Sequence, residues 1–111
     1  MNLVYVIQTG PDGPITIGTS TDRGWTRKLR SLQDANWQIL TVVHLLDGDE
    51  RLERRIHVTL TTHRIRGDWY RADALAAIAA MQIPTLPHDT IAETRRQAAN
   101  VLADLAPKGG G

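Results

Sequence analysis

A predicted β-hairpin at the N-terminus constrains the fold more than any other stretch of the chain. Leu3–Ile7 is an apolar, β-rich run without a polar break, which is typical of a buried strand. Thr9–Pro14 is rich in residues that form turns, and Ile15–Gly18 has the alternating apolar positions of a second short strand. Two strands joined by such a turn predict a hairpin, and therefore an antiparallel pair at the start of the chain.

One further strand and four helices follow the hairpin in our prediction. They are a helix over Arg23–Gln33, a strand over Trp37–Leu46, and helices over Asp49–Thr62, Ala72–Met81 and Thr90–Leu105. Thr90 to Glu93 fits a capping box that would open the last helix. Arg64–Arg66 is expected to form a basic loop, and Asp68–Tyr70 to be extended or irregular. The order β-β-α-β-α-α-α indicates an α/β fold of the α+β type, with a small three-stranded, mainly antiparallel sheet flanked by helices.

Length and composition favour one globular domain without disulfides or membrane spans. The 111 residues suit a single modest core, so we expect residues 1–82 and residues 83–111 to pack as one domain. The chain has no cysteine, which excludes a thiolate metal site and fits an intracellular, cytoplasmic protein. Neither a signal peptide nor an apolar stretch of about 18 residues is visible. The net charge of +1 is too even for a protein that coats DNA.

The segment Leu52–Tyr70 concentrates charged and aromatic residues. Glu53 and His57 are four residues apart, so a helix would place them on one face. Arg64 and Arg66 follow a few residues later. A carboxylate, an imidazole and several guanidinium groups in so short a span indicate a site that handles an anion. Two structural explanations stay open: an ion pair between Glu53 and a neighbouring arginine, and a buried, hydrogen-bonded His57.

Five short motifs occur in a fixed order over about residues 3 to 78. They are Val4–Gln8, Ile15–Gly18, Lys28–Gln33, an E-x-x-x-H motif over Glu53–His57, and an R-x-x-G-D-W-Y motif over Arg64–Tyr70. Their order and spacing resemble the GIY-YIG nuclease superfamily, and most closely its small phage and bacterial branch. The resemblance implies a GIY-YIG-like catalytic domain over residues 1–82 of a phage-encoded or bacterial protein, followed by a C-terminal helix and a flexible tail.

The resemblance also implies a metal-dependent phosphodiesterase that uses Mg²⁺ or Mn²⁺. By position, Glu53 matches the family's metal-binding carboxylate. Tyr5 matches the tyrosine that contacts the nucleophilic water or helps to take its proton. Thr16 stands where the second signature tyrosine is expected, which makes His57 a candidate for the general base.

Basic residues are expected to bind the phosphate and the nucleic acid. Lys28 stands at the position of the family's arginine on the first helix, with Arg27 before it, and either would stabilise charge that develops on the phosphate. Further contacts with nucleic acid are expected from Arg30, Arg54, Arg64, Arg66 and Trp69.

Three functions are compatible with the sequence. The first is a DNA endonuclease. The second is a nucleic-acid-binding module of the same fold that has lost hydrolysis, which Thr16 and Lys28 would explain. The third is a phage or bacterial protein-interaction domain, which the even charge balance favours. The C-terminal helices could recognise DNA, form a homodimer or cover the sheet, and their apolar stripes favour covering or pairing.

Overall fold

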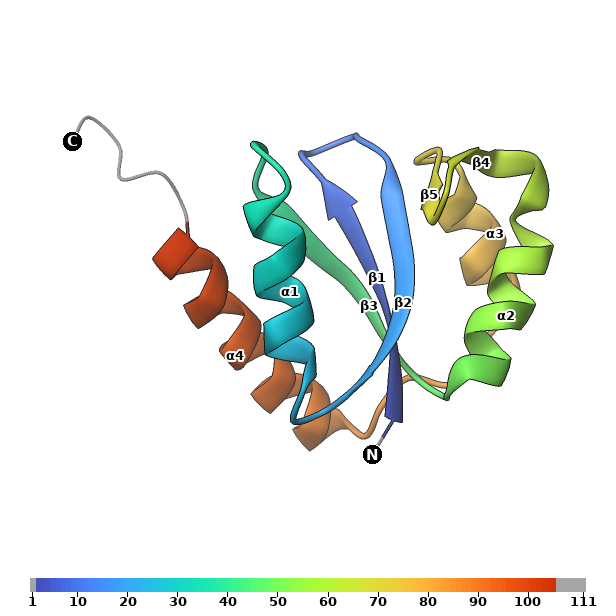
Figure 1. Ribbon diagram of the computed structural model, residues 1–111. Coiled ribbons are helices and arrows are strands. Elements are labelled where there is room, and N and C mark those ends of the chain that lie inside the picture. Colours follow the sequence, from blue (N-terminus) through green and yellow to red (C-terminus); the bar gives the residue numbers. More distant parts are fainter. Residues whose placement is uncertain (1, 106–111) are drawn as a thin grey trace.

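Within residues 2–105, which the computed structural model describes, a five-stranded antiparallel sheet carries two helices on each face (Figure 1). The strands are β1 (Asn2–Thr9), β2 (Ile15–Thr21), β3 (Leu40–Asp47), β4 (Arg64–Arg66) and β5 (Trp69–Tyr70). The helices are α1 (Trp25–Asp34), α2 (Glu50–Thr59), α3 (Ala74–Ala80) and α4 (His88–Leu105), with a 3₁₀ turn at Thr61–His63. The strand order in the sheet is β3-β1-β2-β5-β4.

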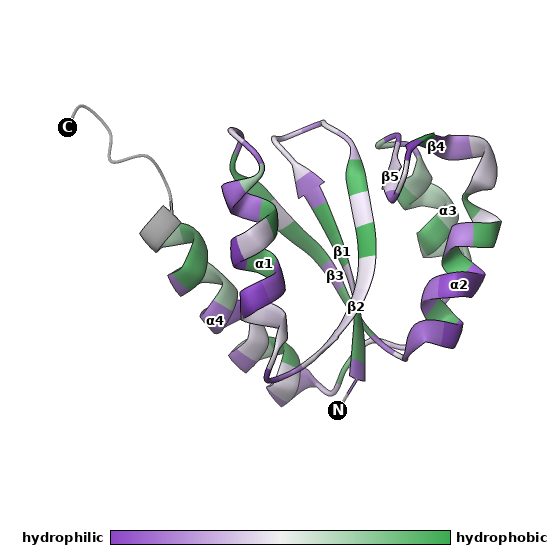
Figure 2. Ribbon diagram, in the orientation of Figure 1, coloured by the Kyte–Doolittle hydropathy of each residue, from purple (hydrophilic) through white to green (hydrophobic). Residues whose placement is uncertain are grey.

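Strand β1 lies between β2 and β3 and is buried on both faces. Leu3, Tyr5 and Ile7 belong to the core shared with α1 and α4, whereas Val4 and Val6 belong to the core shared with α2 and α3. A strand covered on both faces has no solvent-facing position, which explains the unbroken apolar run. In Figure 2 much of the central strands is green, the hydrophobic colour, with pale bands between the green ones on β2. The helices carry both green and purple residues.

The sheet has five strands among the residues that the structure describes, so the prediction of three strands and of the order β-β-α-β-α-α-α is wrong. The expected basic loop forms β4, and Trp69–Tyr70 forms β5. Both strands are too short to show a period in the sequence, and they form because Tyr70 pairs with Ile15 and Trp69 pairs with Thr16. Gly67, with a φ of +54°, makes the tight turn between them.

The start of β3 is displaced from its predicted position. The strand begins at Leu40 instead of Trp37, and the Trp37 side chain is 89% exposed. The cause is Gln33, which is buried at the end of α1. Its side chain accepts a hydrogen bond from the Leu40 N–H at 3.0 Å and donates to the carbonyls of Asn36 and Gln38 at 3.3 and 2.9 Å. These bonds hold the α1–β3 connection as a loop.

The first two helices match their predictions except at their ends. Asp49 caps α2 as expected, because its side chain accepts a hydrogen bond from the Arg51 N–H at 2.9 Å. The α-helix ends at Thr59 and gives way to the 3₁₀ turn, so the predicted extension to residue 62 is wrong in detail. Helix α1 starts at residue 25 instead of 23, after the Thr21 hydroxyl accepts the Gly24 N–H at 2.9 Å.

Helix α4 starts at His88, so the predicted capping box from Thr90 to Glu93 does not form. The Pro87 carbonyl accepts the Ile91 N–H, which places Thr90 inside the first turn. The buried residues Ala98 and Val101 of α4 pack in the core shared with α1. The apolar stripe of α4 therefore covers the sheet, as one of the alternatives predicted. Arg95 of the same helix donates to the Val42 and Val43 carbonyls of β3 at 2.8 and 3.2 Å. The predicted tail, residues 108–111, lies outside the described residues.

Across residues 2–105, no helix combines the length and the apolar character that a membrane span requires.

We predict that Gln33→Leu lowers the free energy of unfolding by about 1–3 kcal/mol, because it leaves the buried Leu40 N–H without its acceptor. Urea denaturation followed by circular dichroism measures the change. Ser31→Ala, at an exposed position of the same helix, is the matched control and should have little effect. A Gln33→Leu protein as stable as the control would show that these hydrogen bonds do not hold the loop.

Candidate functional site

A groove lies beside the free edge of β2. Strand β5 pairs with β2 at Ile15 and Thr16, and no described strand continues this pairing toward Thr21. The hollow next to this edge, here called the edge groove, has a volume of about 450 Å³. Its polar lining includes Glu50, Glu53, Arg54, His57, Arg64 and Asp68.

A second hollow continues the edge groove toward α1. This adjoining hollow has a volume of about 610 Å³ and shares Thr19, Glu50 and Arg54 with the edge groove. Lys28 of α1 and Arg51 of α2 also line it. Helices from opposite faces of the sheet therefore contribute to one continuous concave surface.

Helix α2 supplies most of the groove because of its period. Glu50, Glu53, Arg54 and His57 are spaced by three and four residues, so they lie on one face of the helix. Ile56, on the neighbouring face, is fully buried in the core shared with α3. The packing of this apolar face turns the polar face toward the free edge of β2. Glu53 and His57 both line the groove there, on the shared helix face that their spacing predicts.

Tyr5 reaches the same edge from β1. It pairs with Gly18 of β2, and a Cβ atom on Gly18 would lie 2.2 Å from the Tyr5 hydroxyl oxygen. The phenol therefore crosses β2 at the one position that has no side chain. Burial raises the Tyr5 pKa above its usual value, and the carboxylates of Glu53 and Asp68 raise it further. Tyr5 is not among the residues that line the groove, but it interacts electrostatically with Glu53 and Asp68, which do line it.

The Tyr5 hydroxyl oxygen is not fully buried, although the residue as a whole is only 7% exposed. It makes no hydrogen bond with the described residues. Among these residues, the side-chain polar atom that is both buried and without a partner is Trp25 Nε1. The Tyr5 oxygen is therefore accessible to a water molecule or a ligand.

The β4–β5 unit forms the wall of the groove opposite α2, and it holds His57 in place. Its Nδ1 atom forms a hydrogen bond with the hydroxyl of Tyr70, which is fully buried. The Arg64 guanidinium donates to the same hydroxyl at 3.4 Å and lies 5.8 Å from the centre of the Tyr70 ring. The sequence placed Tyr70 in a motif without a role, and its contacts depend on β5 joining the sheet.

Thr16 has a structural contact in this wall. Its hydroxyl donates to the Asp68 carbonyl at 3.1 Å, which ties the β4–β5 turn to β2. Its predicted catalytic role stays a prediction.

The remaining predicted basic residues divide into two groups. Lys28 lines the adjoining hollow and Arg54 lines both hollows, whereas Arg27 lines neither. Geometry thus favours Lys28 over Arg27 as the basic group of α1. Arg30, Arg66 and Trp69 also lie outside the lining of both hollows. Glu50 and Thr19 line both hollows, although the sequence analysis did not single them out. Glu50 could have been found from the sequence, because it lies three residues before Glu53 and therefore on the same helix face.

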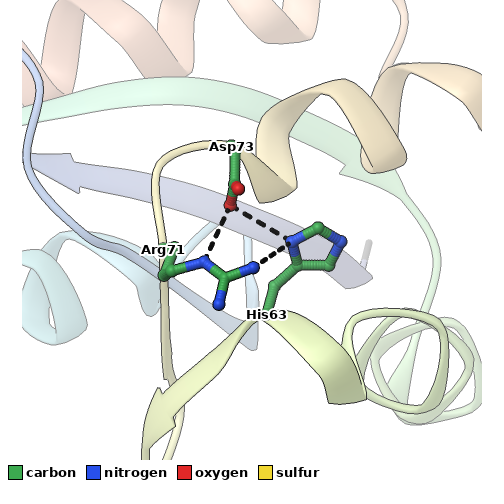
Figure 3. Close-up of polar contacts among 3 residues, drawn as sticks. All are labelled: His63, Arg71 and Asp73. Carbon is green, nitrogen blue, oxygen red and sulfur yellow. Dashed lines mark hydrogen bonds and ion pairs between the residues drawn. The ribbon is translucent and has the colours of Figure 1, made fainter.

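A polar cluster beyond the groove fixes its wall (Figure 3). The Asp73 carboxylate contacts His63 Nδ1 at 3.1 Å and accepts from Arg71 Nε at 3.3 Å. The hydrogen bond with His63, followed by that with Arg71, lowers the Asp73 pKa. The Arg71 N–H also donates to the His63 carbonyl at 2.9 Å. The cluster joins the residue before β4 to the residues after β5, and so closes the β4–β5 unit at its base.

The carboxylates of the groove suit a hard cation that keeps part of its water. Among residues 2–105, no three His, Cys, Asp or Glu side chains come together as a metal cage. Mg²⁺ needs no such cage, because it binds through one or two carboxylates and retains several water molecules. Glu53 and Glu50, one helical turn apart in the same groove, fit this requirement.

Comparison with known proteins gave no match to any family model, curated protein or solved structure.

We predict that Tyr5 ionises above pH 10, and that Glu53→Gln and Asp68→Asn each lower its midpoint by removing a nearby negative charge. NMR signals of the Tyr5 ring, followed toward alkaline pH, measure the midpoint. Because the folded state holds this proton more tightly, the contribution to stability is present below pH 10 and is lost as the pH rises through the folded pKa. Glu93→Gln on α4 is the control. An unchanged midpoint in both groove variants would show that Tyr5 does not face these carboxylates.

Proposed function

We propose that the chain is a metal-dependent endonuclease that hydrolyses phosphodiester bonds in DNA, with the edge groove as its active site. The observation that carries the proposal is the convergence of groups from three parts of the chain on one open edge. Glu53 and His57 come from α2, Arg64 comes from β4, and the Tyr5 hydroxyl comes from β1. Carboxylates, cations and a phenol together can hold a cation, bind a phosphate and orient a water molecule.

In this proposal the cations of the two hollows bind the phosphate backbone. Arg54 and Arg64 would contact the phosphate at the edge groove, and Lys28 and Arg51 would contact its neighbour along the strand. The free edge of β2 leaves this surface open, so a long polymer can lie across it. The basic groups are local, which is compatible with a net charge of +1.

Glu53, supported by Glu50, would hold the Mg²⁺ or Mn²⁺ ion. The chemistry that such an ion would supply at Glu53 is polarisation of the phosphoryl oxygen and stabilisation of the leaving oxygen. Tyr5 orients the attacking water, since its raised pKa keeps the phenol protonated at neutral pH and able to donate a hydrogen bond.

One observation favours a second candidate, a nucleic-acid-binding module without hydrolysis. The Thr16 hydroxyl stands where the resemblance expects a catalytic tyrosine, yet it donates to the Asp68 carbonyl. If catalysis needs a second hydroxyl at this position, the groove would bind DNA and leave it intact.

We predict that the protein nicks supercoiled plasmid in Mg²⁺ or Mn²⁺ and that Glu53→Gln lowers the rate at least about a hundredfold. The reason is that this substitution removes a charged cation ligand, whose contribution is several kcal/mol of transition-state stabilisation. Agarose electrophoresis of timed samples measures nicking. Glu93→Gln, on the exposed surface of α4, should cut like wild type. Equal rates for wild type and Glu53→Gln would exclude the nuclease assignment, and DNA binding without nicking would favour the second candidate.

We predict that Arg54→Ala weakens DNA binding and lowers the slope of log affinity against log salt by about one, because one phosphate contact is lost. Fluorescence anisotropy with a labelled duplex over a series of salt concentrations measures both quantities. Arg55→Ala is a matched control, because Arg55 is the next residue of α2 and lines a different hollow, beside Met81 and Pro84. The same loss in both variants would argue against a phosphate path along the edge groove.

A further inference from the structure

The hydroxyl of Tyr70 is a buried junction between two side chains of the groove. Tyr70 has no exposed surface, so its hydroxyl cannot exchange its partners for water. Its side-chain partners among the described residues are His57 Nδ1 and the Arg64 guanidinium. Among the described residues, the Tyr70 hydroxyl hydrogen-bonds both the imidazole and the guanidinium and so links them.

The number of protons at this junction restricts the tautomer of His57. A tyrosine hydroxyl donates one hydrogen bond and accepts up to two, whereas a guanidinium can only donate. Arg64 therefore uses the Tyr70 oxygen as an acceptor. The Tyr70 proton then needs an acceptor of its own, because a buried donor without a partner costs about 1–3 kcal/mol. Among the described residues that acceptor is His57 Nδ1.

An imidazole protonated at Nδ1 does not satisfy the junction. Two N–H groups, one from His57 and one from Arg64, would then point at the same oxygen. The Tyr70 proton would then be buried without an acceptor among the described residues. The arrangement that satisfies all three groups has the proton on Tyr70, a bare Nδ1 and a hydrogen on Nε2.

We infer that Tyr70 is a positioning residue that holds His57 as the Nε2–H tautomer, so that the imidazole presents an N–H donor to the edge groove. His57 lines the groove, and Nε2 forms no hydrogen bond with the described residues. An N–H donor in the same groove as Arg54 and Arg64 suits a phosphate oxygen. On the proposed function, His57 thus binds the phosphate and does not take the proton of the water. The tautomer itself does not depend on that function.

NMR of the ¹⁵N-labelled protein tests the tautomer directly, since coupling patterns show which ring nitrogen carries hydrogen. His57→Gln assigns the His57 signals, and His88, exposed on α4, is the internal control. We expect the neutral form of His57 to carry its hydrogen on Nε2 and to have a bare, hydrogen-bonded Nδ1. Tyr70→Phe should shift the Nδ1 signal of His57 and leave that of His88 unchanged. A hydrogen on Nδ1, or a signal that does not respond to Tyr70→Phe, would overturn the inference.

A pair of substitutions tests the donor role without relying on activity. His57→Gln keeps an N–H donor near the position of Nε2 but cannot act as a base, whereas His57→Ala removes both. We expect His57→Ala to weaken binding of a labelled DNA duplex, without divalent metal, by about tenfold or more, as for a lost hydrogen bond to a charged group. His57→Gln should retain most of the affinity.

An equal loss in the two variants would overturn the donor role. In a nicking assay, a nuclease that retains activity as His57→Gln would support the donor role, and one that loses all activity would support a base. A wild-type protein that binds DNA without cutting it would exclude the nuclease function. The NMR and binding results decide the tautomer and the donor role in either case.

Discussion

The burial of β1 on both faces is the constraint from which the architecture follows. Five successive residues, Leu3 to Ile7, are buried, and full burial of a large apolar side chain contributes about 1.5–3 kcal/mol. Neither face can be left to water, so the sheet requires a helical layer on each side. This requirement separates α1 from α2 by the thickness of the sheet. Their polar side chains can therefore meet only where the sheet has a free edge.

The free edge of β2 is that meeting place. Pairing with β5 ends at Thr16, and farther along β2 residues 19–21 line the same hollow as Arg54 of α2 and Lys28 of α1. Gly18 lets the Tyr5 phenol cross the strand to the same edge. The result is a groove of mixed charge. Burial and then the nearby carboxylates raise the Tyr5 pKa, while arginines line the same groove. A groove of this kind suits a ligand made of a cation and a phosphate together.

The short β4–β5 unit is the second wall, and long-range contacts hold it. The Thr16 hydroxyl binds the Asp68 carbonyl, Tyr70 binds His57, and the cluster of His63 with Asp73 closes the base. The same contacts that fold the wall also orient the imidazole. A substitution in this wall therefore changes structure and site chemistry together, and spectroscopic and binding measurements separate the two effects better than activity alone.

Local periodicity in the sequence determined the hairpin, the amphipathic helices, the Asp49 cap and the shared face of Glu53 and His57. These features depend on residues within about two helical turns of each other, so a single segment carries enough information. Tertiary structure alone decided that Arg64–Arg66 and Trp69–Tyr70 become strands and that Lys28, instead of Arg27, reaches the concave surface. It also decided that the Tyr70 hydroxyl forms a hydrogen bond with His57. Each of these three outcomes depends on pairing or packing between segments that are distant in the sequence. Strands of two or three residues are also too short to show the alternation of apolar residues by which a strand is recognised.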